Sequence, residues 1–189
     1  MDKIAIVTGS SGQLGEVFVD VLAKDGFYVY AIDIKGNLEK APNKSVQQVS
    51  LDITNENSVK DFFSDLDRLN VLVNNAGIGV FSPFEKRTAD EFKKVTDVNL
   101  LGTFLMSQSA VKIMRNNNGG KIINIASIYG SKSSDERIYG DSGRNNSEVY
   151  SITKAGVIGL TKYMAAHFAK YNIQTNSISP GGIFKNQSN

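Results

Sequence analysis

The sequence predicts an α/β fold of the Rossmann type, a doubly wound parallel sheet with helices on both faces. Short β-branched runs alternate with amphipathic segments of helix length, which is the pattern of a parallel sheet covered by helices. A glycine-rich turn joins the first run to the first helical segment, and an acidic residue ends the second run. The 189 residues suit one domain, so we expect a single domain over 1–189.

Each element follows from its local pattern. The β-branched runs predict six strands, at 3–8, 27–33, 46–50, 69–74, 120–126 and 173–178. The segments between them predict helices over 13–25, 55–66, 88–115 and 149–171. Asn55 stands where a helix N-cap is expected, and Gly26 follows the first helix as a stop. Since crossovers between parallel strands are right-handed, we expect the ligand crevice at the carboxyl ends of the strands.

Composition excludes several classes of function. Twenty-one Lys and Arg against 19 Asp and Glu give a net charge of +2 with no polybasic face, so we expect no nucleic-acid partner. The chain has no cysteine and one histidine, His167, so we expect no disulfide, cysteine nucleophile or metal site. It shows no signal peptide and no apolar run near the ~20 residues that span a bilayer. We therefore expect no membrane partner and a cytoplasmic location.

The first strand leads into the glycine-rich turn 8–15, with the sequence TGSSGQLG. Glycines let a pyrophosphate approach the backbone, and the following helix N-terminus supplies free N–H groups, although a plain βα loop is the alternative. The second strand ends at Asp33, 18 residues after Gly15, close to the ~20 expected for a carboxylate that binds ribose hydroxyls. Because that carboxylate repels a 2′-phosphate, we expect NAD rather than NADP, a preference that nearby Lys35 weakens. The expected contacts in the turn are Gly9, Ser11, Gly12, Gln13, Leu14 and Gly15.

Seven short motifs follow one another at strand ends or on expected helices. They are the glycine-rich turn, Asp52-Ile53, Asn74-Asn75-Ala76-Gly77, Val98-Asn99-Leu100, Ser127, the pair Tyr150 and Lys154, and Pro180-Gly181. In this order the chain resembles the short branch of the short-chain dehydrogenase/reductase family over essentially its whole length. The sequence around Ser127 and Tyr150 is similar to that of family members linked to surface-sugar and flagellin-modification biosynthesis. Alone, the Tyr-x-x-x-Lys pair is equally typical of a surface helix.

The resemblance implies a reversible oxidoreductase that transfers hydride between NAD(H) and an alcohol or carbonyl substrate. Residues four apart share a helix face, so Tyr150 and Lys154 can both point into the crevice. Tyr150 would move the proton, and Lys154 would lower its pKa from ~10 and bind the nicotinamide ribose. Ser127 would hydrogen-bond the substrate oxygen, and Asn99 would hold a water that links Lys154 to solvent. A strand-end turn residue and a helix-kink residue, respectively, are the alternatives for Ser127 and Asn99.

Further cofactor contacts are implied by the same resemblance. They are Asp52 and Ile53 at the adenine, Asn75, Ala76 and Gly77 near the adenosine ribose, and Pro180, Gly181 and Ile183 beneath the nicotinamide. An equal alternative for Asn74 and Asn75 is a structural role in which they tie the fourth strand to Thr8. Helices 88–115 and 149–171 would pair with their copies in a homodimer or homotetramer. Val157, Leu160 and Met164 suit that interface, but core packing explains them equally well.

Three features depart from the family pattern. The spacing T-G-x-x-G-x-x-G is more like the extended sugar-nucleotide epimerase branch. Ser127 and Tyr150 are 23 positions apart, farther than is common, and the extra residues within 131–147 carry cations that would meet a substrate phosphate or carboxylate: Lys132, Arg137 and Arg144. A solvated loop is the alternative there. The chain ends at Asn189, where family members continue, so we expect 1–189 to lack the substrate lid and last strand of the family.

These features favour a phosphorylated or nucleotide-linked sugar as substrate. The alternatives are an NAD-dependent sugar epimerase or dehydratase, which the glycine spacing suggests, and a nucleotide-binding regulator without turnover.

Overall fold

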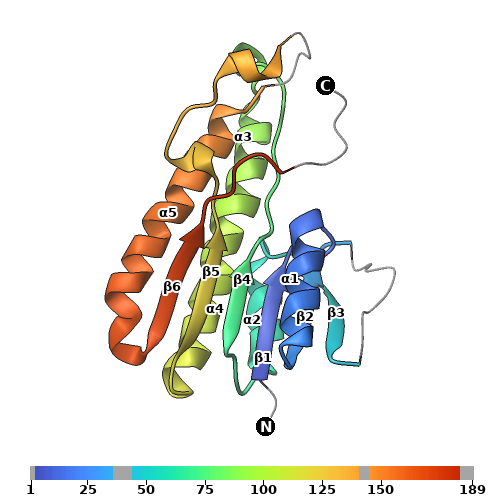
Figure 1. The fold of residues 1–189 in the computed structure, drawn as a ribbon, viewed down its shortest axis with the longest axis vertical. Helices are drawn as coiled ribbons and strands as arrows, with labels where there is room; N and C mark the ends of the chain where they lie inside the picture. The colour runs from blue at the N-terminus through green and yellow to red at the C-terminus, as the bar shows by residue number, and fades with distance from the viewer. Residues whose placement is uncertain (1–2, 36–43, 141–144, 184–189) are drawn as a thin grey trace.

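The computed structural model describes residues 3–35, 44–140 and 145–183. Six parallel strands form one sheet in the order β3-β2-β1-β4-β5-β6 (Figure 1). Their bounds are β1 (Lys3–Thr8), β2 (Phe27–Asp33), β3 (Val46–Ser50), β4 (Val71–Asn74), β5 (Gly120–Ile125) and β6 (Ile173–Ile178). The order reverses on either side of β1, so the switch point lies between β1 and β4, where this fold binds its ligands.

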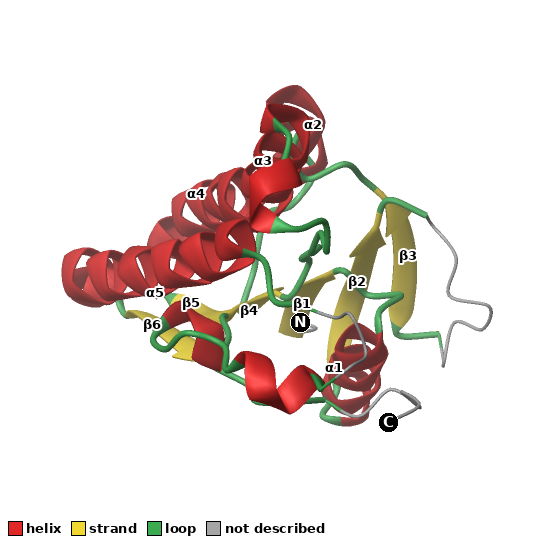
Figure 2. Cartoon of the chain, turned by 90° about the horizontal axis from the view of Figure 1, so that it is seen from above, coloured by secondary structure: helices red, strands yellow, loops and turns green. Residues whose placement is uncertain are grey.

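Helices cover the sheet on both faces, as the sequence predicts. They are α1 (Gln13–Lys24), α2 (Glu56–Ser64), α3 (Ala89–Thr96), α4 (Thr103–Asn116) and α5 (Glu148–Phe168). Figure 2 shows α1 on one face and α2, α4 and α5 on the other. Short 3-10 turns add η1 (Phe84–Lys86), η3 (Ile128–Gly130), η4 (Glu136–Tyr139) and η5 (Ala169–Tyr171). The Rossmann-type, doubly wound fold class is therefore confirmed.

The expected single helix over 88–115 is interrupted. A π-helical segment, η2 (Asp97–Gly102), separates α3 from α4. Gly102 packs directly on Ile53, and a Cβ at Gly102 would lie 2.6 Å from the Ile53 Cδ1 atom. The wider turn also carries Asn99, whose side chain is almost fully buried. Single π turns of this kind occur mostly at functional sites.

Local capping explains where three helices begin. The Asn55 side chain accepts a hydrogen bond from the Ser58 amide at 3.0 Å, which confirms the predicted N-cap of α2. Thr88 and Glu91 form a reciprocal capping box at the start of α3. Ser147 caps α5 by accepting from the Tyr150 amide at 3.4 Å. The last cap matters for the site, because it orients the helical turn that carries Tyr150.

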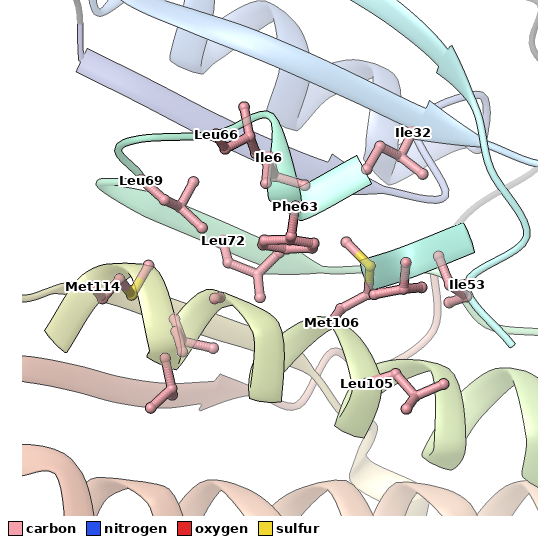
Figure 3. Close-up of a cluster of buried hydrophobic side chains, with 14 of the residues drawn as sticks. Ile6, Ile32, Ile53, Phe63, Leu66, Leu69, Leu72, Leu105, Met106 and Met114 are labelled. Atoms are coloured by element: carbon pink, nitrogen blue, oxygen red, sulfur yellow. The ribbon is translucent and has the colours of Figure 1, made fainter. Parts of the chain in front are cut away.

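Successive side chains along the strands point to opposite faces of the sheet, and each face has its own hydrophobic core. Between the sheet and helices α2 and α4, Ile6 and Leu72 pack against Phe63 and Met106 (Figure 3). On the α1 face the buried side chains are smaller, among them Val7, Val19 and Val29. Each fully buried aliphatic side chain contributes about 1.5–3 kcal/mol. The two cores thus hold the carboxyl ends of the strands as a rigid platform.

Within residues 3–35, 44–140 and 145–183, no helix combines the length and the apolarity needed to cross a bilayer. No group of three His, Cys, Asp or Glu side chains among the same residues is arranged to hold a metal ion.

Candidate active site

Two adjoining pockets open at the carboxyl ends of the strands. The first, which we call the catalytic pocket, has a volume of about 160 Å³. It brings together Leu14, Asn75, Gly77, Ser127, Tyr150, Lys154, Pro180 and Gly181. The second, the dinucleotide pocket, has a volume of about 360 Å³ and is lined by Gly9, Asp33, Asp52, Ile53, Ala76 and Gly77. Gly77 borders both, so most of the residues expected from seven separate motifs share one crevice.

The glycine-rich turn has a conformation that leaves no room for a Cβ atom at Gly9 or Gly15. Gly9 has φ +63°, and a Cβ there would lie 2.7 Å from the Ala76 Cα atom. A Cβ on Gly15 would lie 2.1 Å from the Gly9 carbonyl oxygen, which the rigid backbone cannot accommodate. Gly12 is less restricted, because a Cβ there would lie 3.3 Å from the same oxygen. Gly12 is also the N-cap of α1 and provides no side-chain cap. The turn therefore brings uncapped helix N–H groups close to the crevice.

The residues that follow in this turn have different surroundings. The Ser11 hydroxyl is buried and has no hydrogen-bond partner within the described residues. Gln13 begins α1 and is exposed, whereas Leu14 is half-buried in the catalytic pocket wall. An unpartnered buried hydroxyl beside a helix N-terminus suits an anionic oxygen, so the turn fits the pyrophosphate of a dinucleotide.

Asp33 lies at the end of β2, between the turn and the dinucleotide pocket. One carboxylate oxygen accepts a hydrogen bond from the Ser11 amide at 3.1 Å, and the other accepts from the Lys35 amide at 3.1 Å. The carboxylate therefore braces the glycine-rich turn as well as facing the pocket.

Asp52 and Ile53 occupy the opposite wall of the dinucleotide pocket. Asp52 is exposed, and its Oδ1 atom accepts from both the amide and the hydroxyl of Thr54, at 2.9 and 2.8 Å. Ile53 is buried in the core against Gly102, so its side chain supports the π-helical segment while it lines the pocket.

Asn75, which directly follows β4, ties this strand to Thr8, as one of its two alternatives predicts. Asn74, the last residue of β4, is structural in a different way, because it bonds to α4 and β5 and not to Thr8. Asn75 Nδ2 donates to the carbonyls of Thr8 and Gly9, at 3.1 and 3.0 Å, and its amide donates to Thr8 Oγ1. Asn74 Nδ2 donates to Ser107 Oγ and Asn124 Oδ1, at 2.9 and 2.8 Å. Asn75 also borders the catalytic pocket, so its predicted contact with the cofactor stays a prediction.

Tyr150 and Lys154 share one face of α5, as their spacing predicts. Lys154 is only 5% exposed, and its ammonium donates to the Ile125 carbonyl at 2.7 Å. It lies 5.5 Å from the centre of the Tyr150 ring. Burial lowers the pKa of Lys154 to about 8.

The expectation that Lys154 lowers the pKa of Tyr150 is wrong for this structure. Burial raises the pKa of Tyr150 above its ordinary value of 10.0, and a hydrogen bond with the Ser127 side chain opposes that shift only in part. The neighbouring Tyr129 phenol adds to the rise in the pKa of Tyr150, while the Lys154 ammonium donates to the Ile125 carbonyl. Ser127 is buried and also accepts from the Tyr129 amide at 3.2 Å, so it serves the turn and the pocket together.

Asn99 connects the segment after β4 to the Tyr150 helix. Its Oδ1 accepts from the Ile78 amide at 2.8 Å, and its Nδ2 donates to the Ile78 carbonyl at 3.0 Å and to Thr153 Oγ1 at 3.1 Å. Thr153 Oγ1 in turn donates to the Tyr150 carbonyl at 2.8 Å. The helix-kink alternative thus describes part of the Asn99 role. Sequence reasoning missed Thr153, whose only signal is a hydroxyl between Tyr150 and Lys154.

The segment after β6 closes the crevice. Pro180 and Gly181 line the catalytic pocket, and the Pro180 carbonyl accepts from the Ile128 amide at 3.1 Å. Ile183 is exposed and is not among the residues that line either pocket. Arg144 and residues 184–189 lie outside the described residues.

Comparison with known proteins decides what this crevice is. The family model described as short chain dehydrogenase matches residues 3–187. The chain belongs to the short-chain dehydrogenase family. Levodione reductase of Leifsonia aquatica is 32% identical over 97% of this chain and 70% of its own. The 3-oxoacyl-[acyl-carrier-protein] reductase of Thermotoga maritima is 34% identical over 96% of this chain and 74% of its own.

Solved structures give the same result. A short chain dehydrogenase from Leptospira borgpetersenii with bound NAD⁺ superposes with a TM-score of 0.92 at 41% identity, covering 100% of this chain and 74% of that one. ElxO with NADP bound superposes with a TM-score of 0.82 at 29% identity, covering 96% and 74%. This short-chain dehydrogenase is accordingly an oxidoreductase with a small-molecule substrate and a nicotinamide dinucleotide as cofactor.

Proposed function

We propose that this short-chain dehydrogenase transfers hydride between NAD(H) and an alcohol or carbonyl carbon in the catalytic pocket, with Tyr150 moving the proton. The observation that carries the proposal is the meeting of Ser127, Tyr150 and Lys154 in one pocket that adjoins the dinucleotide pocket at Gly77. Gly9, Ser11 and Leu14 would hold the pyrophosphate, Asp33 the ribose and Asp52 the adenine.

The chain's own residues handle the substrate oxygen. The bound dinucleotide supplies the hydride acceptor or donor. Ser127 Oγ would hold the substrate oxygen. In reduction the Tyr150 hydroxyl donates its proton to that oxygen and becomes a phenolate, and in oxidation the Tyr150 phenolate accepts the proton of the substrate alcohol. Because burial raises the pKa of Tyr150, the phenol is protonated at neutral pH. The phenol is therefore ready to donate its proton in reduction, and the rate of oxidation should rise with pH as the phenol loses its proton.

We propose NAD rather than NADP as the cofactor. The Asp33 carboxylate lines the dinucleotide pocket, and the 2′-phosphate of an NADP whose ribose lay against it would meet a like charge. Structural neighbours are known with either cofactor, so this carboxylate carries the argument.

We propose a sugar that carries a phosphate or nucleotide as the substrate class. A polar groove of about 780 Å³ begins at Tyr129, next to Ser127, and its lining includes Ser131, Lys132 and Asn145. Asn145 Oδ1 is buried without a hydrogen-bond partner among the described residues. Arg137 pairs with Asp135, so among the described residues of this loop Lys132 is the cation that lines the groove and could meet an anionic group. Lys132→Met should raise the KM of a phosphosugar and leave that of its uncharged sugar unchanged.

We propose a homodimer formed through α4 and α5. Phe104 and Tyr163 are exposed and border an apolar hollow of about 300 Å³ between the two helices. Val157 and Met164 are buried within the chain itself, which supports core packing as their role. Phe104→Glu should convert the dimer to a monomer, and light scattering after size-exclusion chromatography would measure it.

The direct test of the proposed function is net hydride transfer. A panel of phosphosugars, nucleotide sugars and simple alcohols is incubated with NAD⁺, and the absorbance of reduced nicotinamide is followed. We expect accumulation of NADH, which an epimerase that uses NAD transiently would not produce. An absence of NADH binding by fluorescence would overturn the proposal outright.

A further inference from the structure

Arg87, between η1 and α3, is a buried cation that the proposed chemistry does not use. Its side chain is only 6% exposed. Burying a guanidinium is costly unless its N–H groups are paired, and here they are. Nε donates to Glu148 Oε1 at 3.1 Å, while Nη2 donates to the Ser82 carbonyl at 2.7 Å and Nη1 to the Ser82 hydroxyl. The planar fork thus reaches two separate segments at once.

The partners of Arg87 belong to three elements. Ser82 lies in the segment that follows β4, and Glu148 is the first residue of α5. Glu91, in the first turn of α3, lies 3.8 Å from Arg87 Nη1 and accepts from the Ser82 hydroxyl at 2.9 Å. The Arg87 network, defined as Ser82, Arg87, Glu91 and Glu148, therefore joins these three elements at one point.

The Arg87 network is connected to Tyr150 in two ways, through the first turn of α5 and through the segment 78–82. Glu148 precedes Tyr150 by two residues in the first turn of α5. The segment 78–82 is held at one end by Asn99, which pairs with Ile78, and at its other end by Arg87. Between these anchors, a Cβ on Gly79 would lie 4.0 Å from the Tyr150 Cδ2 atom. Segment 78–82 is thus a wall of the site beside the Tyr150 ring.

We infer that Arg87 is a positioning residue that holds the wall 78–82 and the first turn of α5 in register, and so sets the orientation of Tyr150. The inference rests on the proposed role of Tyr150. A displacement of about 1 Å at a reacting group costs up to ~100-fold in rate. The described hydrogen bonds of Arg87 reach neither the glycine-rich turn nor Asp33, so cofactor affinity should not depend on it.

The test compares Arg87→Met, Arg87→Lys and Glu148→Gln with the wild type. Turnover is measured with NAD⁺ and a substrate identified in the panel described above, and NADH affinity is measured by fluorescence. We expect Arg87→Met to lower kcat by about 10- to 100-fold with NADH affinity changed less than about twofold. Arg87→Lys restores the charge but not the fork, so it should recover only part of kcat. Lys60→Met, which removes the exposed Lys60–Glu56 pair of α2, is the matched control and should leave kcat unchanged.

Amide hydrogen exchange provides a readout that needs no turnover. In Arg87→Met and Glu148→Gln, exchange should speed up in peptides covering 78–82 and 148–152 and stay unchanged in α1. An unchanged kcat together with unchanged exchange would overturn the inference, as would a loss of NADH affinity that parallels the loss of kcat. Tyr150→Phe is assayed alongside. If it keeps full activity, the proposed function fails; if it is inactive while Arg87→Met is normal, only the role of Arg87 fails.

Discussion

The two sides of the crevice are built by different means. On the side of β1, β2 and α1, the backbone packs so closely that Gly9 and Gly15 have no room for a Cβ atom. On the side of β4, β5 and α5, the shape comes from hydrogen bonds between side chains and distant backbone, such as those of Asn99 and Lys154. Added atoms should therefore damage the first side through stability and cofactor affinity. On the second side, a substitution that removes a hydrogen-bond donor should lower kcat.

The largest expected effect falls on the second side. Tyr150→Phe removes the hydroxyl that moves the proton and keeps the buried ring. A positioned acid or base contributes about 10²- to 10⁴-fold, so kcat should fall by roughly that factor. NADH affinity and the thermal midpoint should stay at wild-type values, since the ring still packs. A kcat within twofold of the wild type would disprove the proton-transfer role.

Lys154 makes the second side sensitive to pH. Its pKa is about 8 in the folded chain and 10.5 ordinarily, so the unfolded chain holds this proton more tightly. Stability therefore rises with pH between these two values. Relative to Lys154→Met, the wild type should gain up to about 3 kcal/mol of unfolding free energy across that window. Urea unfolding of both proteins at several pH values measures the difference, and parallel curves would contradict the burial of a charged Lys154.

A substitution at Gly15 tests the side of β1, β2 and α1, where glycine allows close backbone packing. In Gly15→Ala the new Cβ would lie 2.1 Å from the Gly9 carbonyl oxygen and 2.8 Å from the Ser10 Cα atom. Forcing backbone apart costs about 1–3 kcal/mol or more, so both unfolding free energy and NADH affinity should fall. Gly159→Ala is the control, because nothing lies within 4 Å of its Cβ position in α5. That variant should gain up to ~1 kcal/mol, and equal losses in both would refute the distinction.

The smallest expected effect concerns the choice of cofactor. Asp33→Ser removes the charge that a 2′-phosphate would meet and leaves a hydroxyl. Loss of one like-charge contact should shift the NADH-to-NADPH affinity ratio by about tenfold, or ~1.4 kcal/mol. NADH affinity itself should also weaken slightly, since Asp33 accepts from the Ser11 amide. Fluorescence titration with both cofactors measures the ratio, and an unchanged ratio would remove Asp33 from the specificity argument.

Patterns local in the chain predicted most of the fold. Four strands, among them β1 and β2, have the expected bounds, because β-branched runs and their turns act over a few residues. The break in the helix 88–115 was missed. It lies where Gly102 meets Ile53 and Asn99 bonds to Ile78, and both contacts join residues far apart in sequence. β4 begins two residues later than expected, at Val71.

The candidate site divides in the same way. The sequence by itself determined most of the residues that line the crevice, although not Ile183, since parallel strands bring their carboxyl ends to one edge and motifs at those ends must meet. Only the tertiary structure decided how they behave. Lys154 faces the Ile125 carbonyl, Tyr150 has a raised pKa, and Arg87 reaches Glu148 across 61 positions. Burial and long-range hydrogen bonds set these properties, and neither is recorded in the spacing of a motif.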